Sequence, residues 1–513
     1  MPLLDHADRR RAEILRDLAL VNPFLPERVA LERAFLGERF VPFGQARAPR
    51  PDLEPDPNTG PLVDEATALL RDAQFTASRS PTSAATDTER EMLGQVGVFV
   101  LYHRFHRELF ELAERLDGSA TRVEVPWFDA FERETEADLT LGDERLLPEE
   151  DAPRLLELCA QIARCFHSVF ARIGGRSEAA VRLRAEIWQS VFTHDLVRYR
   201  RTLGPRMVEV PTLVTGPSGT GKELVAEAVG RSAHLPFDPR AKAFVFDEGE
   251  AFHPLAISSL SPTLVESELF GHKRGAFTGA LADRAGRFER CPSYGAVFLD
   301  ELGEIDAEIQ VKLLRVLQSR TFERIGEHEP RRFRGRLVSA TNRDLDTEIE
   351  RGRFREDLYY RVAADRIETP SLRALIAGDA SELEHLVGFA AARLVGRDGD
   401  EARRLAADTA EWIEAELGLD HEWPGNFREL EQCVRSFAVR GSYRPRGRGA
   451  HGAASDPAKA LAADVLAGRS TADDLLDRYC ALVHADAGTW EGAARRLGLD
   501  RRTVKARAER ALQ

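Results

Sequence analysis

The chain has 513 residues, 43% of them hydrophobic, which is enough for packed cores and indicates two to four domains. Its formal net charge of −13 argues against nonspecific coating of nucleic acid by the whole molecule, although a local basic surface remains compatible with it. The five cysteines lack metal-ligand spacing and no segment approaches the roughly twenty apolar residues of a membrane span, so we expect a reduced, cytoplasmic protein without structural zinc or a membrane contact.

Residues 1–175 are predicted to form a mainly helical domain. A Pro-rich polar interruption lies between Pro42 and Asn58, and a Ser/Thr-rich loop lies near 76–88. The strongest predicted helix spans about 91–116, and the apolar side of this helix carries Val96, Phe99, Val100, His103 and Leu109.

The chemistry of this first domain is less specific. His103, His106 and the segment 159–167 lack the spacing of a metal site, so we expect core residues there. Trp127, Phe128 and Phe131 could line a small-molecule pocket or fill a core, and the core is favoured. The domain lacks the alternating βα pattern and the acidic pocket of a receiver domain. We expect it to be a regulatory domain that responds to an unknown ligand or protein.

A short buried strand at 212–215 runs into a glycine-rich loop and then into the apolar-periodic helix that contains Leu224 and Val225. Strand, loop and helix in this order are the context of a P-loop, whose backbone N–H groups bind phosphates at a helix N-terminus. Lys222 would reach the β- and γ-phosphates of ATP. The predicted nucleotide-binding residues are Gly216, Pro217, Ser218, Gly219, Thr220, Gly221, Lys222 and Glu223.

A glycine-bracketed hexapeptide follows at 275–280, with the sequence Gly275, Ala276, Phe277, Thr278, Gly279 and Ala280. The two glycines permit backbone angles that other residues avoid, so the segment can form a tight, movable tip. Alternatively, the segment is a plain turn whose Phe277 packs inward. The hexapeptide resembles the sigma-54 contact loop of bacterial enhancer-binding proteins, the transcription activators that use an AAA+ ATPase to remodel RNA polymerase.

Further along, an apolar strand ends in Asp300 and Glu301. Phosphoryl transfer needs a metal that neutralises charge and a group that orients the attacking water. Asp300 fits the first role, as a ligand of Mg²⁺, and Glu301 fits the second. Paired acids at a strand end often only cap the next helix, but a cap would not explain the separate P-loop in the same domain.

The resemblance implies further site residues. The strand before Asn342 looks like the sensor I strand, and the segment 352–361 looks like the arginine-finger segment, in which Arg355 and Arg361 would enter the site of a neighbouring subunit. The segment around Arg428 resembles the sensor II motif, with Arg428 sensing the nucleotide. Each arginine could alone be a surface ion-pair partner. Together they imply a homo-oligomeric ring, with a hexamer as the expected form.

The sequence also departs from the family pattern. Glu223 replaces the Ser or Thr that usually contacts Mg²⁺ in a P-loop, although the family commonly has Glu at this point. Ala256 stands where the family usually has an Asn that restrains the catalytic glutamate. The stretch 244–254, with Asp247, Glu248 and Glu250, is longer and more acidic than a simple strand, and the segment after Pro370 is divergent.

The C-terminus carries an independent signal. Helical periodicity at 473–485 is followed by a helix at 491–497, a turn, and a last helix from 501 to about 512 that Asp500 can cap. This pattern resembles the Fis-like helix-turn-helix domain of enhancer-binding proteins. An amphipathic helix with a solvated basic face is the alternative. The predicted DNA-binding residues are Arg501, Arg502, Thr503, Lys505 and Arg507.

The resemblance therefore implies an α/β AAA+ P-loop domain, with a parallel sheet and a helical lid, at 181–440. A helical domain precedes it at 1–175, a linker at 441–465 follows it, and a helix-turn-helix occupies 466–513. The expected function is sigma-54-dependent activation of RNA polymerase from enhancer DNA, with ATP and Mg²⁺ as cofactors. The alternative is a nucleotide- and DNA-binding regulator that no longer activates polymerase; a helicase or protein-remodelling enzyme would leave the hexapeptide unexplained.

Overall fold

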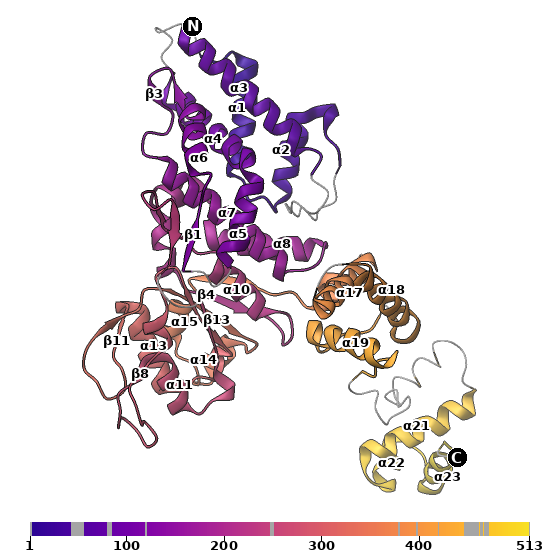
Figure 1. Ribbon diagram of the computed structural model, residues 1–513. Coiled ribbons are helices and arrows are strands. Elements are labelled where there is room, and N and C mark those ends of the chain that lie inside the picture. The colour runs from indigo at the N-terminus through magenta and orange to yellow at the C-terminus, as the bar shows by residue number, and fades with distance from the viewer. Residues whose placement is uncertain are drawn as a thin grey trace. The chain divides into compact units, whose positions relative to one another are not determined.

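The computed structural model describes residues 3–42, 56–79, 85–117, 121–246, 251–377, 380–396, 399–418, 420–445, 461, 465 and 471–511. They fall into two compact units, Met1–Arg435 and Ser436–Gln513 (Figure 1). Several sequence features lie wholly or partly outside the described residues: the Pro-rich interruption, the Ser/Thr-rich loop, the acidic residues Asp247, Glu248 and Glu250, and the linker at 441–465.

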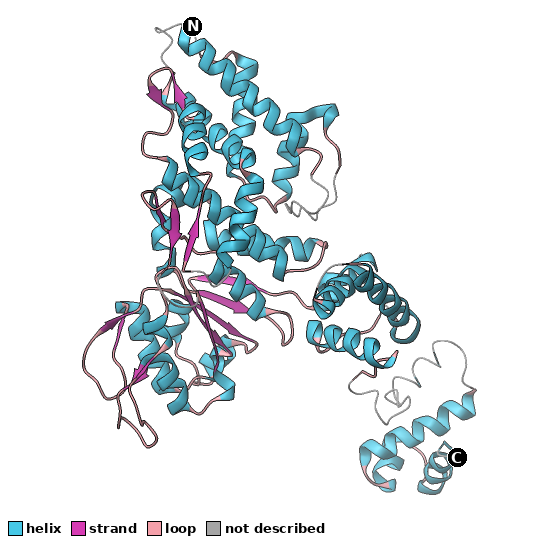
Figure 2. Cartoon of the chain, in the orientation of Figure 1, coloured by secondary structure: helices cyan, strands magenta, loops and turns pink. Residues whose placement is uncertain are grey.

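The first part of the chain is mainly helical, as predicted (Figure 2). Its helices begin at N-caps that the sequence supplies; Thr86, for example, forms a reciprocal capping box with Glu89. The elements are α1 His6–Leu20, α2 Pro26–Leu36, η1 Gly37–Arg39, α3 Thr59–Arg79, α4 Asp87–Arg104, α5 His106–Asp117, α6 Phe128–Asp138, β2 Thr140–Leu141, β3 Glu144–Arg145, α7 Ala152–Arg172 and α8 Glu178–Phe192.

The single helix predicted over 91–116 is wrong, because the chain forms two helices, α4 and α5, that meet at Phe105. Phe105 is buried, and its ring packs against Trp127 and Phe131 with centroid distances of 5.5 and 5.2 Å. This aromatic packing offers a physical reason for the break, because the helix turns where the ring enters the core. The expectation that Phe128 and Phe131 fill a core is confirmed, since both are buried.

The helical part packs directly against the nucleotide-binding part of the first unit. Strand β1 (Arg122–Glu124) pairs antiparallel with β6 (Ala243–Val245), which also pairs with β5 (Phe237–Asp238). Gln161 and Arg164 of α7 donate hydrogen bonds to backbone carbonyls at 231–233. One hydrophobic cluster runs from Phe24 to Ile367. The boundary near residue 175 stays a prediction.

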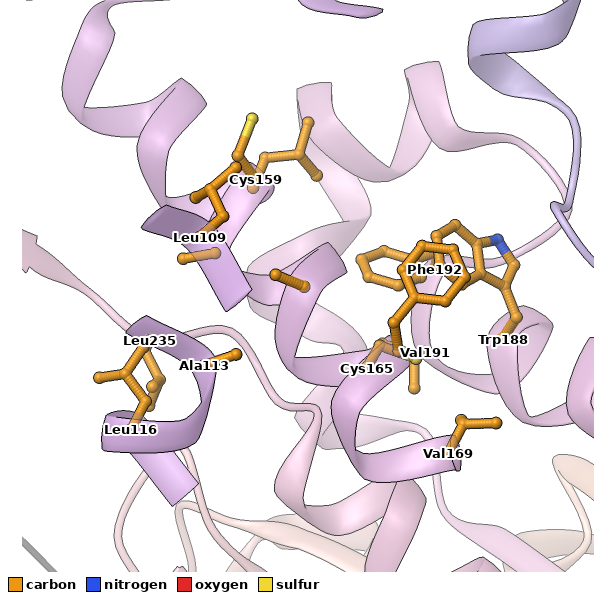
Figure 3. Packing of buried hydrophobic residues seen from close by; sticks show 14 of the residues in the cluster. Leu109, Ala113, Leu116, Cys159, Cys165, Val169, Trp188, Val191, Phe192 and Leu235 are labelled. Carbon is orange, nitrogen blue, oxygen red and sulfur yellow. The ribbon is translucent and has the colours of Figure 1, made fainter. Parts of the chain in front are cut away.

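Helices α7 and α8 both contribute large side chains to this cluster. Figure 3 shows Cys165 and Val169 of α7 beside Trp188, Val191 and Phe192 of α8. The Trp188 and Phe192 rings have centroids 4.4 Å apart. Large aromatic side chains bury much apolar area, so these rings contribute strongly to the stability of the core.

A five-stranded parallel sheet forms the centre of the nucleotide-binding part, in the order β14-β4-β13-β10-β7. Its inner strands are almost entirely buried, and the apolar run Ala296–Leu299 of β10 reflects this burial on both faces. The strands are β4 Thr212–Thr215, β7 Phe252–Ala256, β10 Ala296–Asp300, β13 Arg336–Thr341 and β14 Asp365–Glu368. This sheet with its helical flanks is the predicted α/β AAA+ fold.

The helices and hairpins around the sheet complete the first unit. They are α9 Leu196–Arg198, η2 Tyr199–Leu203, η3 Gly204–Glu209, α10 Lys222–Arg231, η4 Ile257–Ser259, α11 Pro262–Phe270, β8 Gly271–His272, β9 Arg284–Ala285, α12 Arg287–Arg290, η5 Leu302–Glu304, α13 Ala307–Ser319, β11 Thr321–Phe322, β12 Arg331–Arg332, α14 Leu345–Glu350 and α15 Glu356–Val362. The helical lid consists of α16 Leu372–Ile376, α17 Ala380–Val395, α18 Asp400–Trp412, η6 Ile413–Leu417 and α19 Asn426–Arg440.

The second unit contains a three-helix arrangement, α21 Ala472–Ala487, α22 Trp490–Leu497 and α23 Arg501–Ala511. Cys480, Ala493, Val504 and Ala508 form its small core. These bounds lie within two residues of the helix ends predicted from the sequence. The small side chains allow α22 and α23 to approach closely, as a helix-turn-helix requires.

All five cysteines are free and buried. Burial raises the pKa of the Cys159, Cys165, Cys291 and Cys433 thiols to about 12. Among the described residues, no cluster of three or more metal-ligating side chains occurs. In the same part of the chain, no helix is both long enough and apolar enough to cross a bilayer.

A buried arginine links the sheet to α8. Arg336 of β13 is only 5% exposed, and its guanidinium donates hydrogen bonds to the Ser190 and Val210 carbonyls and to the Thr212 hydroxyl. It also contacts the Asp365 carboxylate at 3.4 Å. A buried charge is tolerated only when such partners compensate its desolvation.

We expect Arg336→Ala to lower the free energy of unfolding by about 3 kcal/mol, because the Asp365 carboxylate loses its buried partner. Differential scanning fluorimetry of the full chain measures the resulting drop in Tm. The exposed Arg334, two residues earlier, provides the control, and Arg334→Ala should stay within about 0.5 kcal/mol of the parent. Equal Tm changes in the two variants would contradict this role of Arg336.

Candidate functional site

The predicted P-loop follows β4 and leads directly into α10. The side chain of Lys222, the first residue of α10, donates hydrogen bonds to the Gly216 and Pro217 carbonyls, both at 3.1 Å. The loop therefore curls around the lysine head group. Gly219 has a φ of 78°, and a Cβ there would lie 2.3 Å from the Gly425 carbonyl oxygen, so only glycine fits this position.

Two acids at the end of β10, Asp300 and Glu301, act on the charge of Lys222. Burial lowers the pKa of the Lys222 ammonium, while the carboxylates of Glu301 and Asp300 act in the opposite direction. A lysine near two acids and only 6% exposed is suited to bind a polyanion that displaces its carbonyl contacts.

Strand order brings Asp300, Glu301 and Asn342 to the same edge of the sheet as the P-loop. Strand β13 lies between β4 and β10, and all three run parallel, so their carboxyl ends meet. The Asn342 backbone N–H lies 3.4 Å from a Glu301 carboxylate oxygen. Glu301 has a φ of 59°, a conformation that is costly for a residue with a side chain and often marks a functional position.

A magnesium ion would find oxygen ligands here. Burial, followed by the nearby charges of Asp300 and Glu227, raises the pKa of the Glu223 carboxyl, so negative charge at this point is under-compensated. Mg²⁺ typically uses one or two protein carboxylates and takes its other ligands from water and phosphate. Asp300 and Glu223 fit this requirement.

The lid contacts the P-loop through residues that follow Trp423. Asn426, with a φ of 52°, donates a hydrogen bond from its side-chain amide to the Ser218 carbonyl and accepts one from the Leu372 N–H, both at 2.9 Å. Arg428 reaches the Ser218 hydroxyl at 3.4 Å. Arg428 was predicted from the sequence, whereas the contact made by Asn426 was not. The signal available for Asn426 is its residue type, because Asn tolerates a left-handed backbone better than most residues.

A small cavity of about 50 Å³ adjoins the P-loop and was also missed. Its walls are largely apolar and come from helices far apart in sequence, namely α7, α8, α10, α16, α17 and α19. Sequence patterns could not reveal it, because each contributing leucine or phenylalanine is also explained by helix packing alone. The lining includes Leu183, Leu224, Leu375, Leu386, Phe389 and Phe427.

The two candidate arginine fingers are exposed on and beside α15. The Arg355 guanidinium pairs with Asp357 at 2.7 Å, and its backbone N–H donates to the Gln310 side chain. Arg361 is exposed, and no hydrogen bond or ion pair to it occurs among the described residues. Neither arginine contacts the P-loop or the strand-end acids within this chain, so their catalytic assignment stays a prediction.

The hexapeptide at 275–280 forms a hydrogen-bonded tip between β8 and β9. Gly275 donates to the Ala280 carbonyl at 2.8 Å, and Ala280 donates to the Phe277 carbonyl at 3.0 Å. The Phe277 ring lies edge-on to His272, with a centroid distance of 4.9 Å, and is half-buried. Thr278 is exposed. The tip is thus an ordered projection.

Ala256 lies at the end of β7, where its Cα pairs in register with Asp300. The sequence departure therefore lies beside the strand-end acids. A methyl group offers no hydrogen bond, and the Glu301 carboxylate instead accepts a hydrogen bond from the Asn342 N–H.

The predicted DNA-binding residues of the last helix, α23, differ in exposure. Asp500 caps it by accepting a hydrogen bond from the Thr503 N–H. Arg507 contacts Asp477 of α21 at 2.8 Å, so it holds the helices together as well as adding charge. Arg501 and Arg502 are exposed at the N-terminal end, where a recognition helix meets DNA bases.

Comparison with known proteins identifies the central region. Residues 193–368 match the family described as the Sigma-54 interaction domain. The chain is 45% identical to the Nif-specific regulatory protein of Azotobacter vinelandii over 44% of this chain and 39% of that protein. It is 39% identical to the Nif-specific regulatory protein of Klebsiella pneumoniae over 59% of this chain and 54% of that protein.

Another relative is the anaerobic nitric oxide reductase transcription regulator NorR of Aeromonas salmonicida, which is 34% identical over 64% of this chain and 61% of that protein. The chain thus spans roughly half the length of these curated relatives. Residues 193–368 form a sigma-54 interaction domain, and through it the chain is related to the sigma-54-dependent transcriptional activators.

Proposed function

We propose that this chain hydrolyses ATP at the edge of the β4-β13-β10 sheet and uses the turnover to remodel sigma-54 RNA polymerase for open-complex formation. The convergence of the Lys222 loop, the Asp300–Glu301 pair and Asn342 at one sheet edge is the observation that carries the proposal. The family match and the exposed hexapeptide support the choice of target.

In this proposal each group has one task. Residues 216–221 and Lys222 bind the triphosphate. Asp300 and Glu223 would hold Mg²⁺, which would neutralise phosphate charge when bound. Glu301 orients and polarises the attacking water, Asn342 positions Glu301 through its backbone N–H, and Arg428 senses the nucleotide from the lid.

The ring and the DNA contact complete the proposed cycle. The exposed Arg361 and Arg355 would reach phosphates bound by a neighbouring subunit, so that a homo-oligomeric ring, expected to be a hexamer, forms the complete site. Phe277 and Thr278 would press against sigma-54, while α23 holds the ring on enhancer DNA in the cytoplasm.

A second candidate function rests on Ala256. Because this residue pairs in register with Asp300 and offers no hydrogen bond, hydrolysis and target contact could be uncoupled. The chain would then be a nucleotide- and DNA-binding regulator without activating power. ATP turnover without open complexes, in an assay with purified sigma-54 polymerase and enhancer DNA, would favour this alternative.

The first test addresses the chemistry. Glu301→Gln should keep ATP binding and lower turnover at least about a hundredfold, because the amide cannot polarise water. Lys222→Ala should weaken ATP binding at least about tenfold, since a charged hydrogen-bond donor is lost. A phosphate-release assay and calorimetric titration measure the two effects. Glu308→Gln, which removes an exposed carboxylate on α13, is the control. Normal turnover in Glu301→Gln would remove Glu301 from this role.

The second test separates hydrolysis from its use. Phe277→Ala or Thr278→Ala should retain most ATP turnover and lose sigma-54 engagement, because both side chains lie on the tip and outside the phosphate site. Leu281, which is 88% exposed just beyond the tip, gives a matched control in Leu281→Ala. Native electrophoresis with sigma-54 and a promoter-opening assay measure the outcome. Normal opening by the tip variants would refute the assignment.

The third test concerns the ring. Neither Arg361→Ala nor Lys222→Ala should hydrolyse ATP alone, but a mixture should recover part of the turnover where an intact finger meets an intact P-loop. Arg366→Ala, which removes an exposed arginine of β14, should keep turnover on its own. Steady-state ATPase rates of mixed protomers provide the measurement. No recovery at any mixing ratio would argue against a finger supplied by a neighbour.

A further inference from the structure

A second and much larger cavity lies in the helical part of the first unit. It has a volume of about 490 Å³ and is lined by residues of α1 to α5 and α7 to α9 together with Arg200 of η2. Its volume is roughly three times that of the 150 Å³ cavity known to hold one benzene molecule. It also lies within the usual range of roughly 300–1,000 Å³ for small-molecule sites.

The walls of this cavity are mostly aromatic and aliphatic. Phe24 of the α1–α2 turn, Phe166 of α7 and Trp188 of α8 form one side, with ring centroids 5.2 to 6.2 Å apart. Phe99 and Tyr102 of α4 also line the cavity. Aromatic side chains like these bind apolar, ring-containing molecules by burying their apolar surface and by edge-to-face or offset ring contacts.

Two polar atoms on the walls have no hydrogen-bond partner among the described residues. They are the Tyr102 hydroxyl and the side-chain amide nitrogen of Gln95. Gln95 is 2% exposed, and its carbonyl oxygen already accepts a hydrogen bond from Arg200 at 3.1 Å. A buried donor without a partner is costly, so both atoms are placed to bind an acceptor on a ligand.

The buried charges around the cavity are already matched, whereas the exposed Asp64 also lies on its lining. Arg28 pairs with the buried Glu32, and Arg200 pairs with the buried Glu150, both at 2.7 Å. Burial, with help from Arg28 and His106, lowers the pKa of His103 to about 3, so this ring is neutral at physiological pH. A charged group in the buried part of the cavity would therefore lack a free counter-charge.

We propose that this cavity binds an uncharged, largely apolar, ring-containing organic molecule that accepts a hydrogen bond from Tyr102 or Gln95, and that its occupancy changes the affinity of the P-loop site for nucleotide. The second half of this inference rests on the proposed function. Helices α7 and α8 extend from this cavity to the small cavity beside the P-loop.

Both helices line both cavities. On α7, Ile162 faces the large cavity and Arg172, at the C-terminal end, faces the small cavity beside the P-loop. On α8, Trp188 lines the first and Leu183 the second. Because α7 is also hydrogen-bonded to the end of α10, a ligand that shifts α7 or α8 changes the walls of the nucleotide site.

The test uses the full chain and prodan, a neutral naphthalene with a carbonyl acceptor whose emission moves to shorter wavelength in an apolar site. We expect saturable binding with this shift. Ile162→Trp, which fills the cavity, should weaken prodan binding at least about tenfold. Ile14→Trp places the same ring at a half-buried isoleucine that is not part of the cavity wall, and should leave binding unchanged.

Tyr102→Phe keeps the ring and removes only the hydroxyl. It should weaken prodan binding about three- to tenfold without lowering Tm, because the hydroxyl has no partner in the unliganded protein. The matched control is Tyr199→Phe, since the Tyr199 hydroxyl donates to Gln161 at 2.8 Å. This control should lower Tm and leave prodan binding unchanged. Absent binding, or equal binding by parent, Ile162→Trp and Tyr102→Phe, would overturn the ligand site.

The coupling has its own measurement. Prodan titrations with and without saturating ADP should give Kd values that differ about fivefold or more, since coupled sites influence each other reciprocally. Calorimetry of ADP binding to the parent shows independently whether the nucleotide site exists. If ADP binds and the prodan Kd stays the same, the coupling is refuted. If ADP fails to bind, the proposed function fails, whereas the prodan result still decides the ligand site.

Discussion

Parallel pairing of β4, β13 and β10 is the constraint on which the nucleotide site depends. Each strand is buried on both faces, and each is followed by a polar segment: the P-loop, the segment beginning at Asn342, and the Asp300–Glu301 pair. The hydrogen-bonded register fixes the relative positions of these segments, because a slip of one residue would move every side chain of a strand to the opposite face of the sheet. The chemistry is thus placed by backbone geometry.

Two further links connect this edge to the rest of the first unit. Asn426 joins the lid to the P-loop through hydrogen bonds to the Ser218 carbonyl and the Leu372 N–H. On the opposite end of the strands, Arg336 joins β13 to the last residues of α8. The nucleotide site therefore lies between elements that can move with the lid and elements that belong to the helical region. Such an arrangement can transmit binding at one place to another.

Sequence patterns predicted the strands, the P-loop and the C-terminal helices because each depends on local spacing. They failed at Phe105, since helical periodicity continues through it and only the tertiary contact with Trp127 and Phe131 ends α4. They missed Asn426 and both cavities for a related reason. A cavity is made by residues of many helices, and each residue alone has the pattern of ordinary core packing. The catalytic and contact roles of the site residues stay predictions.

The buried cysteines have a practical consequence for studying motion. Maleimide reagents attack exposed thiolates, and all five native thiols are buried, with pKa values raised by burial. A cysteine introduced at the exposed Thr278 would therefore react selectively in the folded protein without prior removal of the native ones. Spin labels or fluorophores attached at this tip could then follow its displacement during nucleotide turnover in an otherwise unaltered chain.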